Sequence, residues 1–117
     1  MTAIEKGKLG EQKAEDYLVS IGYNILTKNY RQRFGEIDII AEEPGINDST
    51  IVFIEVKTWN KFTFFDLEYS INSNKRYKIK KTSLNYLYTT VKNIYKYIRY
   101  DVILIQNDDI NHIKGAF

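Results

Sequence analysis

The sequence has 117 residues, a length typical of one compact domain, and we expect residues 1–117 to form it. With no cysteine and a single histidine, it excludes disulfides, thiolate zinc sites and multi-histidine metal centres, so any metal site must use oxygen ligands. No stretch approaches the about 18 apolar residues of a membrane span, and the N-terminus lacks the apolar run of a secretory signal. We therefore expect a cytoplasmic protein without membrane partners.

The net charge of +2 is unevenly distributed along the chain. Residues 57–100 contain 10 Lys and Arg against 2 Asp and Glu, whereas residues 1–56 contain 6 against 10. A basic segment beside an acidic cluster is typical of a protein that holds a polyanion near a cation-binding site. A Lys-rich helix can equally be a solvated face.

Residues 3–21 predict an amphipathic helix with Ile4, Leu18 and Ile21 on its apolar stripe. Glu11 lies seven residues from both Ile4 and Leu18. A seven-residue step rotates a helical side chain by only about 20°, so Glu11 is expected to project from the stripe. Such a carboxylate is costly unless it is paired with a lysine, reaches solvent, or binds a metal.

Three strands are predicted next. Residues 23–30 and 36–41 form a hairpin through a turn at 31–35, and residues 42–50 form a loop rich in turn residues. The strand at 51–58 is apolar on both faces at its start, which predicts a central position in the sheet.

Alternation along these strands predicts which side chains share a face. Glu55 and Lys57 share one face of the third strand, and the opposite face holds Val52, Ile54 and Val56. In the second strand, Glu36 and Asp38 are expected on one face, with Ile37, Ile39 and Ala41 on the other.

The aromatic segment 59–65 is either a hydrophobic bridge or a substrate-facing loop.

A helix is predicted over residues 70–97, followed by strands at 99–105 and 110–117. The expected buried stripe of this helix is Tyr77, Leu84, Leu87, Val91 and Ile94. Its first turns are crowded by Lys75, Arg76, Lys78, Lys80 and Lys81. Cations there oppose the helix dipole, so a bound polyanion or solvent screening must compensate.

The predicted order α-β-β-β-α-β-β favours an α/β sandwich, in which a central mixed β-sheet is flanked by two long helices.

Ionisable residues interrupt this apolar pattern at Asp38 and, after a spacer of 16 residues, at Glu55-Val56-Lys57. With Glu11, the set of three carboxylates and one ammonium sums to −2. Two like charges ~4 Å apart repel by about 1 kcal/mol in water and about 4 kcal/mol at an effective dielectric near 20. One Mg²⁺ or Mn²⁺ would neutralise the set, with the Val56 carbonyl as a further ligand.

A metal held there could bind a phosphodiester oxygen and acidify an attacking water. Lys57 could position or deprotonate that water and offset charge in the transition state. Chance also produces Glu-x-Lys, and an Asp in a strand is usually explained by an edge or a partner. Three separate elements carry an ionisable residue where an apolar residue is expected, and they lie beside the most basic helix. This coincidence favours nuclease chemistry.

The chain resembles the YraN-type endonuclease-like family of small bacterial proteins. The residues that carry the resemblance are Leu9-Gly10-Glu11 with Ala14 and Leu18, Gly22-Tyr23, Asn29 with Arg31, Gly35-Glu36-Ile37-Asp38, Phe53 to Lys57, Ser70-Ile71 with Lys75, Arg99 to Val102, and Ala116-Phe117. The resemblance implies a restriction-endonuclease-like fold of the PD-(D/E)xK kind, similar to archaeal Holliday junction resolvases.

By this resemblance, Asp38 and Glu55 are the metal ligands, Lys57 is the catalytic lysine, and Glu11 closes the site directly or through water. The matching positions Asn29, Arg31, Lys75 and Arg99 are expected to contact phosphates. Arg76 and Lys78 of the basic helix complete the expected nucleic-acid-binding set.

The sequence departs from the family pattern at two places. Residues 58–65 are aromatic and free of glycine where the family usually has an arginine and then a glycine, which affects the expected DNA contacts of that segment. Ile37 stands where the motif name has proline, which leaves the chemistry intact.

The expected function is Mg²⁺- or Mn²⁺-dependent hydrolysis of DNA phosphodiester bonds, with branched or structured DNA as the candidate substrate. Two alternatives stay open: a module that binds nucleic acid or a protein partner without cleavage, and an oligomerisation or scaffold protein that uses the aromatic segment 59–65. A homodimer is a candidate assembly.

Overall fold

The computed structural model describes residues 1–59, 71–90 and 97–117. Its elements are α1 (Ala3–Ser20), β1 (Asn24–Gln32), β2 (Gly35–Glu43), β3 (Thr50–Trp59), α3 (Ser73–Thr89), β4 (Tyr97–Gln106) and β5 (Asp109–Ile113). The predicted α/β class and order of elements are confirmed. No helix in the described part of the chain is long and apolar enough to cross a membrane.

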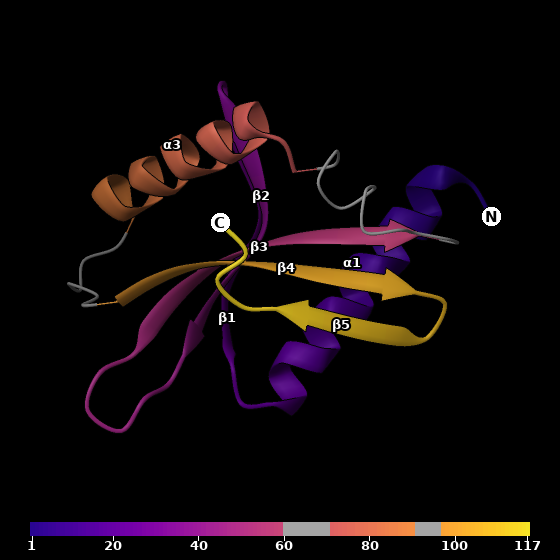
Figure 1. The fold of residues 1–117 in the computed structure, drawn as a ribbon, viewed down its shortest axis with the longest axis horizontal. Helices are drawn as coiled ribbons and strands as arrows, with labels where there is room; N and C mark the ends of the chain where they lie inside the picture. Colours follow the sequence, from indigo (N-terminus) through magenta and orange to yellow (C-terminus); the bar gives the residue numbers. More distant parts are fainter. Residues whose placement is uncertain (60–70, 91–96) are drawn as a thin grey trace.

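The five strands form one mixed sheet in the order β1-β2-β3-β4-β5 (Figure 1). β3 and β4 are parallel, whereas β1–β2, β2–β3 and β4–β5 are antiparallel. The predicted central position of β3 is confirmed. Its residues Ile51 to Ile54 are fully buried, because helices cover both faces of the sheet at this strand.

The two helices lie on opposite faces of the sheet. Val52 and Ile54 pack in a cluster with Leu18 of α1. Ile51 and Phe53, which point the other way, pack with Ile79 of α3. β3 therefore contributes to two hydrophobic cores, one on each face of the sheet. Its residues nearer the C-terminal end continue to alternate between these two faces.

The predicted apolar stripe of α1 is wrong at both of its ends, since Ile4 is 73% exposed and Ile21 is 45% exposed. The buried side of α1 is made of Gly10, Ala14 and Leu18 instead. Small residues there let the helix approach β3 closely: a Cβ added at Gly10 would lie 2.0 Å from the Thr58 Oγ1 atom. The sequence pattern missed this stripe because glycine and alanine carry little hydrophobic signal.

The predicted stripe of α3 is wrong at Tyr77 and Leu84, which are exposed, whereas Leu87 packs against the core as predicted. The helix buries Ile79, Thr82, Ser83 and Tyr86. The Thr82 and Ser83 hydroxyls donate to helix carbonyls at 2.7 and 2.6 Å, which makes these polar side chains compatible with burial. α3 ends at Thr89, so the predicted positions Val91 and Ile94 lie outside the described residues.

The face assignment in β2 needs one correction. Ile39 and Ala41 pack on the α1 side as a pair, but Ile37 packs on the α3 side with Tyr30. The pairing of β2 with β3 ends at Ile39, and Asn29 of the neighbouring strand has a left-handed φ of 50°. Strict alternation therefore fails where the hairpin bends.

A buried polar network fastens β4 and β5 to the α1 side of the sheet. Asp101, which is fully buried, accepts hydrogen bonds from Arg99 Nε at 2.7 Å, Arg99 Nη2 at 2.9 Å and the Gly115 N–H at 3.0 Å. His112 Nε2 lies 2.7 Å from the same carboxylate. Arg99 Nη1 donates to Glu43 at 2.8 Å. These contacts hold the pKa of Asp101 below its usual value despite burial, chiefly through His112 and Arg99.

We predict that Asp101→Ala lowers the free energy of unfolding by about 3–5 kcal/mol, because it removes the fully buried carboxylate that pairs with Arg99 and His112 and leaves Glu43 as the carboxylate partner of Arg99. Urea denaturation at pH 7 measures the loss. Since the folded pKa of Asp101 is lowered, its stabilisation is present above the unfolded value and disappears as pH falls through the folded value. The difference between the two proteins should therefore shrink on acidification. Asp109→Ala, at an exposed position, is the matched control, and equal stability of both variants would contradict the prediction.

Candidate functional site

β3 places Glu55 and Lys57 on the α3 face, as predicted. Glu55 follows Phe53 on that face and is only 7% exposed. The Lys57 Nζ atom lies 3.3 Å from Glu55 Oε1, and its side chain is 23% exposed. A nearly buried carboxylate and its lysine therefore end the apolar stretch of the central strand.

β2 brings Asp38 to the same place through a hydrogen bond to the backbone. The paired register of β2 and β3 ends at Ile39 and Ile54. Just beyond it, Asp38 Oδ2 accepts the Val56 N–H at 2.8 Å. The Asp38 side chain thus continues the contact between the strands where backbone pairing stops.

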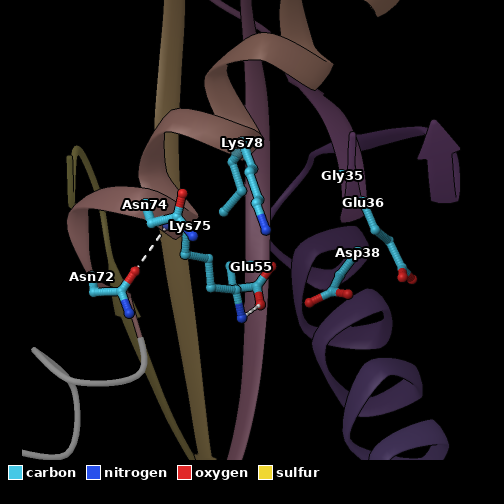
Figure 2. A pocket seen from close by; sticks show the side chains of 9 residues that line it. Gly35, Glu36, Asp38, Glu55, Asn72, Asn74, Lys75 and Lys78 are labelled. Atoms are coloured by element: carbon cyan, nitrogen blue, oxygen red, sulfur yellow. Dashed lines mark hydrogen bonds and ion pairs between the residues drawn. The ribbon is translucent and has the colours of Figure 1, made fainter. Parts of the chain in front are cut away.

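Two clefts meet at these carboxylates. The first has a volume of about 370 Å³ and is lined by Gly35, Glu36, Asp38, Glu55, Asn72, Asn74, Lys75, Lys78 and Ile79. Figure 2 shows Asp38 and Glu55 side by side, with Lys75 and Lys78 reaching toward them from α3. The second cleft, of about 340 Å³, is lined by Ala3, Lys6, Gly7, Glu11, Asp38, Glu55, Val56, Lys57 and Thr58. Asp38 and Glu55 therefore lie between a cleft toward α3 and a cleft toward the start of α1.

The predicted set of Glu11, Asp38, Glu55 and Lys57 is brought together at the second cleft. Glu11 is half-buried on α1. It lies next to the buried residues Gly10 and Ala14, and not on an apolar stripe that includes Ile4, which is exposed. Within the part of the chain that the structure describes, no three or more Asp, Glu or His side chains are arranged to hold a metal ion among them. The carboxylates share a cleft, but they are not gathered into a closed coordination shell.

Burial and neighbouring negative charges disfavour ionisation of the Asp38 carboxyl. Burial, together with the negative charges of Glu55 and Glu11, raises the pKa of Asp38 to about 8, although the Val56 hydrogen bond acts in the opposite direction. Burial also lowers the pKa of Lys57, with the neighbouring Lys75 ammonium acting in the same direction. Burial opposes the charge of Lys75 as well, but Glu55 outweighs it and raises the pKa of Lys75.

The oxygen donors of this cluster fit a small divalent cation. Asp38 and Glu55 would be ligands, with the Val56 carbonyl and Glu11, directly or through water, completing the set. The pKa of Asp38 is raised first by burial and then by the negative charge of Glu55. Added positive charge at this point would favour the ionised form of Asp38.

Most of the predicted phosphate contacts lie around the first cleft or at its edge. Lys75 and Lys78 line it. Arg31 is 74% exposed, and its Nε lies 3.3 Å from Oε1 of Glu36, which also lines the cleft. Arg76 is exposed at the start of α3, where its Nε donates to the Ile71 carbonyl at 3.0 Å.

Two predicted contacts have other roles in the structure. The guanidinium of Arg99 points inward, and its Nε, Nη1 and Nη2 atoms all donate to the buried network of Asp101, Glu43 and Tyr23. The prediction that Arg99 contacts phosphate is therefore corrected. Asn29 is exposed, and its left-handed backbone shapes the bend of the hairpin.

The sequence analysis missed Lys6, Asn72 and Asn74, which line the clefts. Gly7 precedes Glu11 by four residues, so helical spacing from Glu11 was a usable signal for Gly7, but not for Lys6, which precedes Glu11 by five. No comparable signal existed for Asn72, whose side chain caps α3 by accepting the Lys75 N–H at 2.9 Å.

We predict that Asp38→Asn stabilises the metal-free protein at alkaline pH. The folded pKa of Asp38 is raised, so the wild type loses stability as pH rises from about 4 toward 8, whereas the amide does not titrate. In EDTA the two proteins should have similar stability at pH 5, and the variant should be more stable by about 2 kcal/mol at pH 9. Urea denaturation across this range measures the difference. A constant difference at all pH values, or the same trend in the exposed control Asp109→Asn, would contradict the prediction.

Comparison with known proteins places the chain in a family. The model of "Uncharacterised protein family UPF0102" matches residues 10–105. The UPF0102 protein of Thermodesulfovibrio yellowstonii is 46% identical over 117 residues, covering 100% of this chain and 99% of the relative. The UPF0102 protein of Persephonella marina is 48% identical over 113 residues, covering 96% and 92% of the two chains. With matches along almost its whole length, the chain belongs to the UPF0102 family, the family of the YraN-type proteins that its motifs resemble.

Proposed function

We propose that this protein is a Mg²⁺- or Mn²⁺-dependent DNA endonuclease with a restriction-endonuclease-like fold, acting in the cytoplasm on branched or structured DNA. The observation that carries the proposal is the pair of Asp38 and Glu55, held together at the junction of two clefts with Lys57 alongside. A structural role would not require Asp38, whose pKa is raised by burial and by neighbouring carboxylates, to lie beside Glu55 at the edge of two clefts, since perturbed ionisation of this kind is typical of functional sites.

Asp38, Glu55 and Lys57 would have different roles in the hydrolysis of a phosphodiester. A bound cation would polarise the phosphodiester and acidify a water. Asp38 and Glu55 would hold that ion, and the Val56 hydrogen bond holds Asp38 in orientation. Lys57, whose pKa is lowered by burial, is suited to accept a proton from the attacking water or to stabilise charge on phosphorus.

Positive charge on α3 supports DNA as the substrate. Residues 73–89 contain five Lys and Arg and no Asp or Glu. Lys78 lines the first cleft, and Arg76 is exposed near the start of α3. A phosphate backbone laid along this helix would meet these cations before it reached Asp38 and Glu55.

We predict that the purified protein cleaves DNA in Mn²⁺ and that Asp38→Ala and Lys57→Ala each reduce the rate by about 100-fold or more, because each removes a group at the reacting phosphate. Gel assays with a four-way junction and a linear duplex of the same sequence measure both activity and preference. EDTA should abolish cleavage, and Asp109→Asn, an exposed residue outside both clefts, should leave it unchanged. Equal cleavage by the wild type and Asp38→Ala would overturn the assignment.

We predict that Lys78→Ala and Arg76→Ala weaken DNA binding uniformly across sequences and lower the slope of log K against log salt by about 1 each. Fluorescence anisotropy in Ca²⁺ at several salt concentrations measures the slope. Lys28→Ala is the matched control, because Lys28 pairs with Glu15 of α1, outside both clefts. A loss of the same size in this control would show that α3 is not the binding surface.

One observation favours a second candidate, a nucleic-acid-binding module without cleavage. Glu55 is already neutralised by two ammonium groups, from Lys57 and Lys75. Such a module would bind DNA with the same dependence on α3 but would show no cleavage in any metal, and its binding would survive Asp38→Ala. Self-association through the aromatic segment stays a prediction, since residues 60–65 lie outside the described part of the chain.

A further inference from the structure

Lys75 spans the first cleft and contacts the central carboxylate. Its Nζ atom lies 2.7 Å from Glu55 Oε1, closer than the 3.3 Å of Lys57. Figure 2 shows this side chain extended from the first turn of α3 to β3. The prediction from sequence placed Lys75 on a phosphate, but the structure places it on Glu55.

The position of Lys75 is well defined by its backbone. Asn72 caps α3 by accepting the Lys75 N–H, which fixes the start of the helix above the cleft. The first turn of α3 contains no acidic residue of its own. A cation in this turn is unfavourable for the helix dipole, so the carboxylate of Glu55 supplies the compensation.

This contact conflicts with binding of a metal. Both ammonium groups lie on Glu55 Oε1, so a divalent cation bound to Asp38 and Glu55 would share that carboxylate with two positive charges that repel it. Lys57 lies two residues from Glu55 on the same strand, so its position is tied to that of Glu55. Lys75 comes from another element through a long side chain that is 34% exposed, so it can leave without moving β3.

We propose that Lys75 is an internal counter-ion, which neutralises Glu55 in the metal-free protein and moves from it to a phosphate of the nucleic acid when a divalent cation binds. The inference rests on the proposed function for its metal and its substrate. Lys75 then couples the two ligands: the metal releases the ammonium group, and the released ammonium strengthens binding of the polyanion.

Calorimetry with Mn²⁺ alone, at one pH and without DNA, tests the first half. Lys75→Gln should bind Mn²⁺ about tenfold more tightly than the wild type, because the ion no longer competes with a cation at Glu55. Lys75→Arg keeps the charge and should retain the weaker affinity. Lys80→Gln is the matched control on the same helix, and it should bind Mn²⁺ like the wild type, because the Lys80 ammonium lies over the Tyr100 ring and Lys80 lines neither of the two clefts.

Anisotropy with a short DNA duplex tests the second half. In EDTA, Lys75→Gln and the wild type should bind equally, since Lys75 is held by Glu55. In Ca²⁺, which supports binding without turnover, the variant should bind more weakly than the wild type. An equal loss in both conditions would mean that Lys75 contacts phosphate at all times and would overturn the proposal.

The outcomes separate this proposal from the endonuclease. Equal Mn²⁺ affinity in the wild type and Lys75→Gln would overturn the counter-ion role and leave the endonuclease standing. Tighter binding by Lys75→Gln without any cleavage would support the counter-ion and contradict the endonuclease. Failure of both proteins to bind Mn²⁺ would overturn both. Circular dichroism of each variant confirms that the compared proteins are folded.

Discussion

The hydrogen bond from the Val56 N–H to the Asp38 carboxylate is the interaction on which the candidate site depends. It forms where the pairing of β2 with β3 ends, and it holds a carboxylate against Glu55 despite their repulsion. The free energy needed for this arrangement comes from apolar burial on both faces of β3, by α1 on one side and α3 on the other. The fold thereby supports an electrostatically unfavourable arrangement at its centre.

Two buried aspartates show how differently the same side chain can be used. Asp101 is enclosed by Arg99, His112 and the Gly115 N–H, and its pKa is lowered. The pKa of Asp38 is raised, because burial and two neighbouring carboxylates outweigh its backbone hydrogen bond. Asp101 holds β4 and β5 together, and its charge is already compensated. Asp38 lies between two clefts, and added positive charge there would stabilise its ionised form. Of the two, the position of Asp38 is the one suited to a ligand.

The lysines around Glu55 come from different elements, which gives the site two ways to balance its charge. Lys57 lies on the same strand and moves with the site, whereas Lys75 depends on where α3 begins. The clefts on either side extend this division, since one is lined from α3 and the other from the start of α1. A ligand that filled both clefts would contact both helices and cross the carboxylate pair.

The sequence by itself determined the order of elements, the central place of β3 and the shared face of Glu55 and Lys57, because alternation in a buried strand is a local property. Only the tertiary structure decided which side of each helix is buried. Gly10 and Ala14 contribute through close approach, and Thr82 and Ser83 satisfy their hydroxyls within α3, so neither stripe has a hydrophobic signature. The contacts of Arg99 with Glu43 and of Lys75 with Glu55 join side chains more than 15 residues apart in the chain, and only folding brings such charges together.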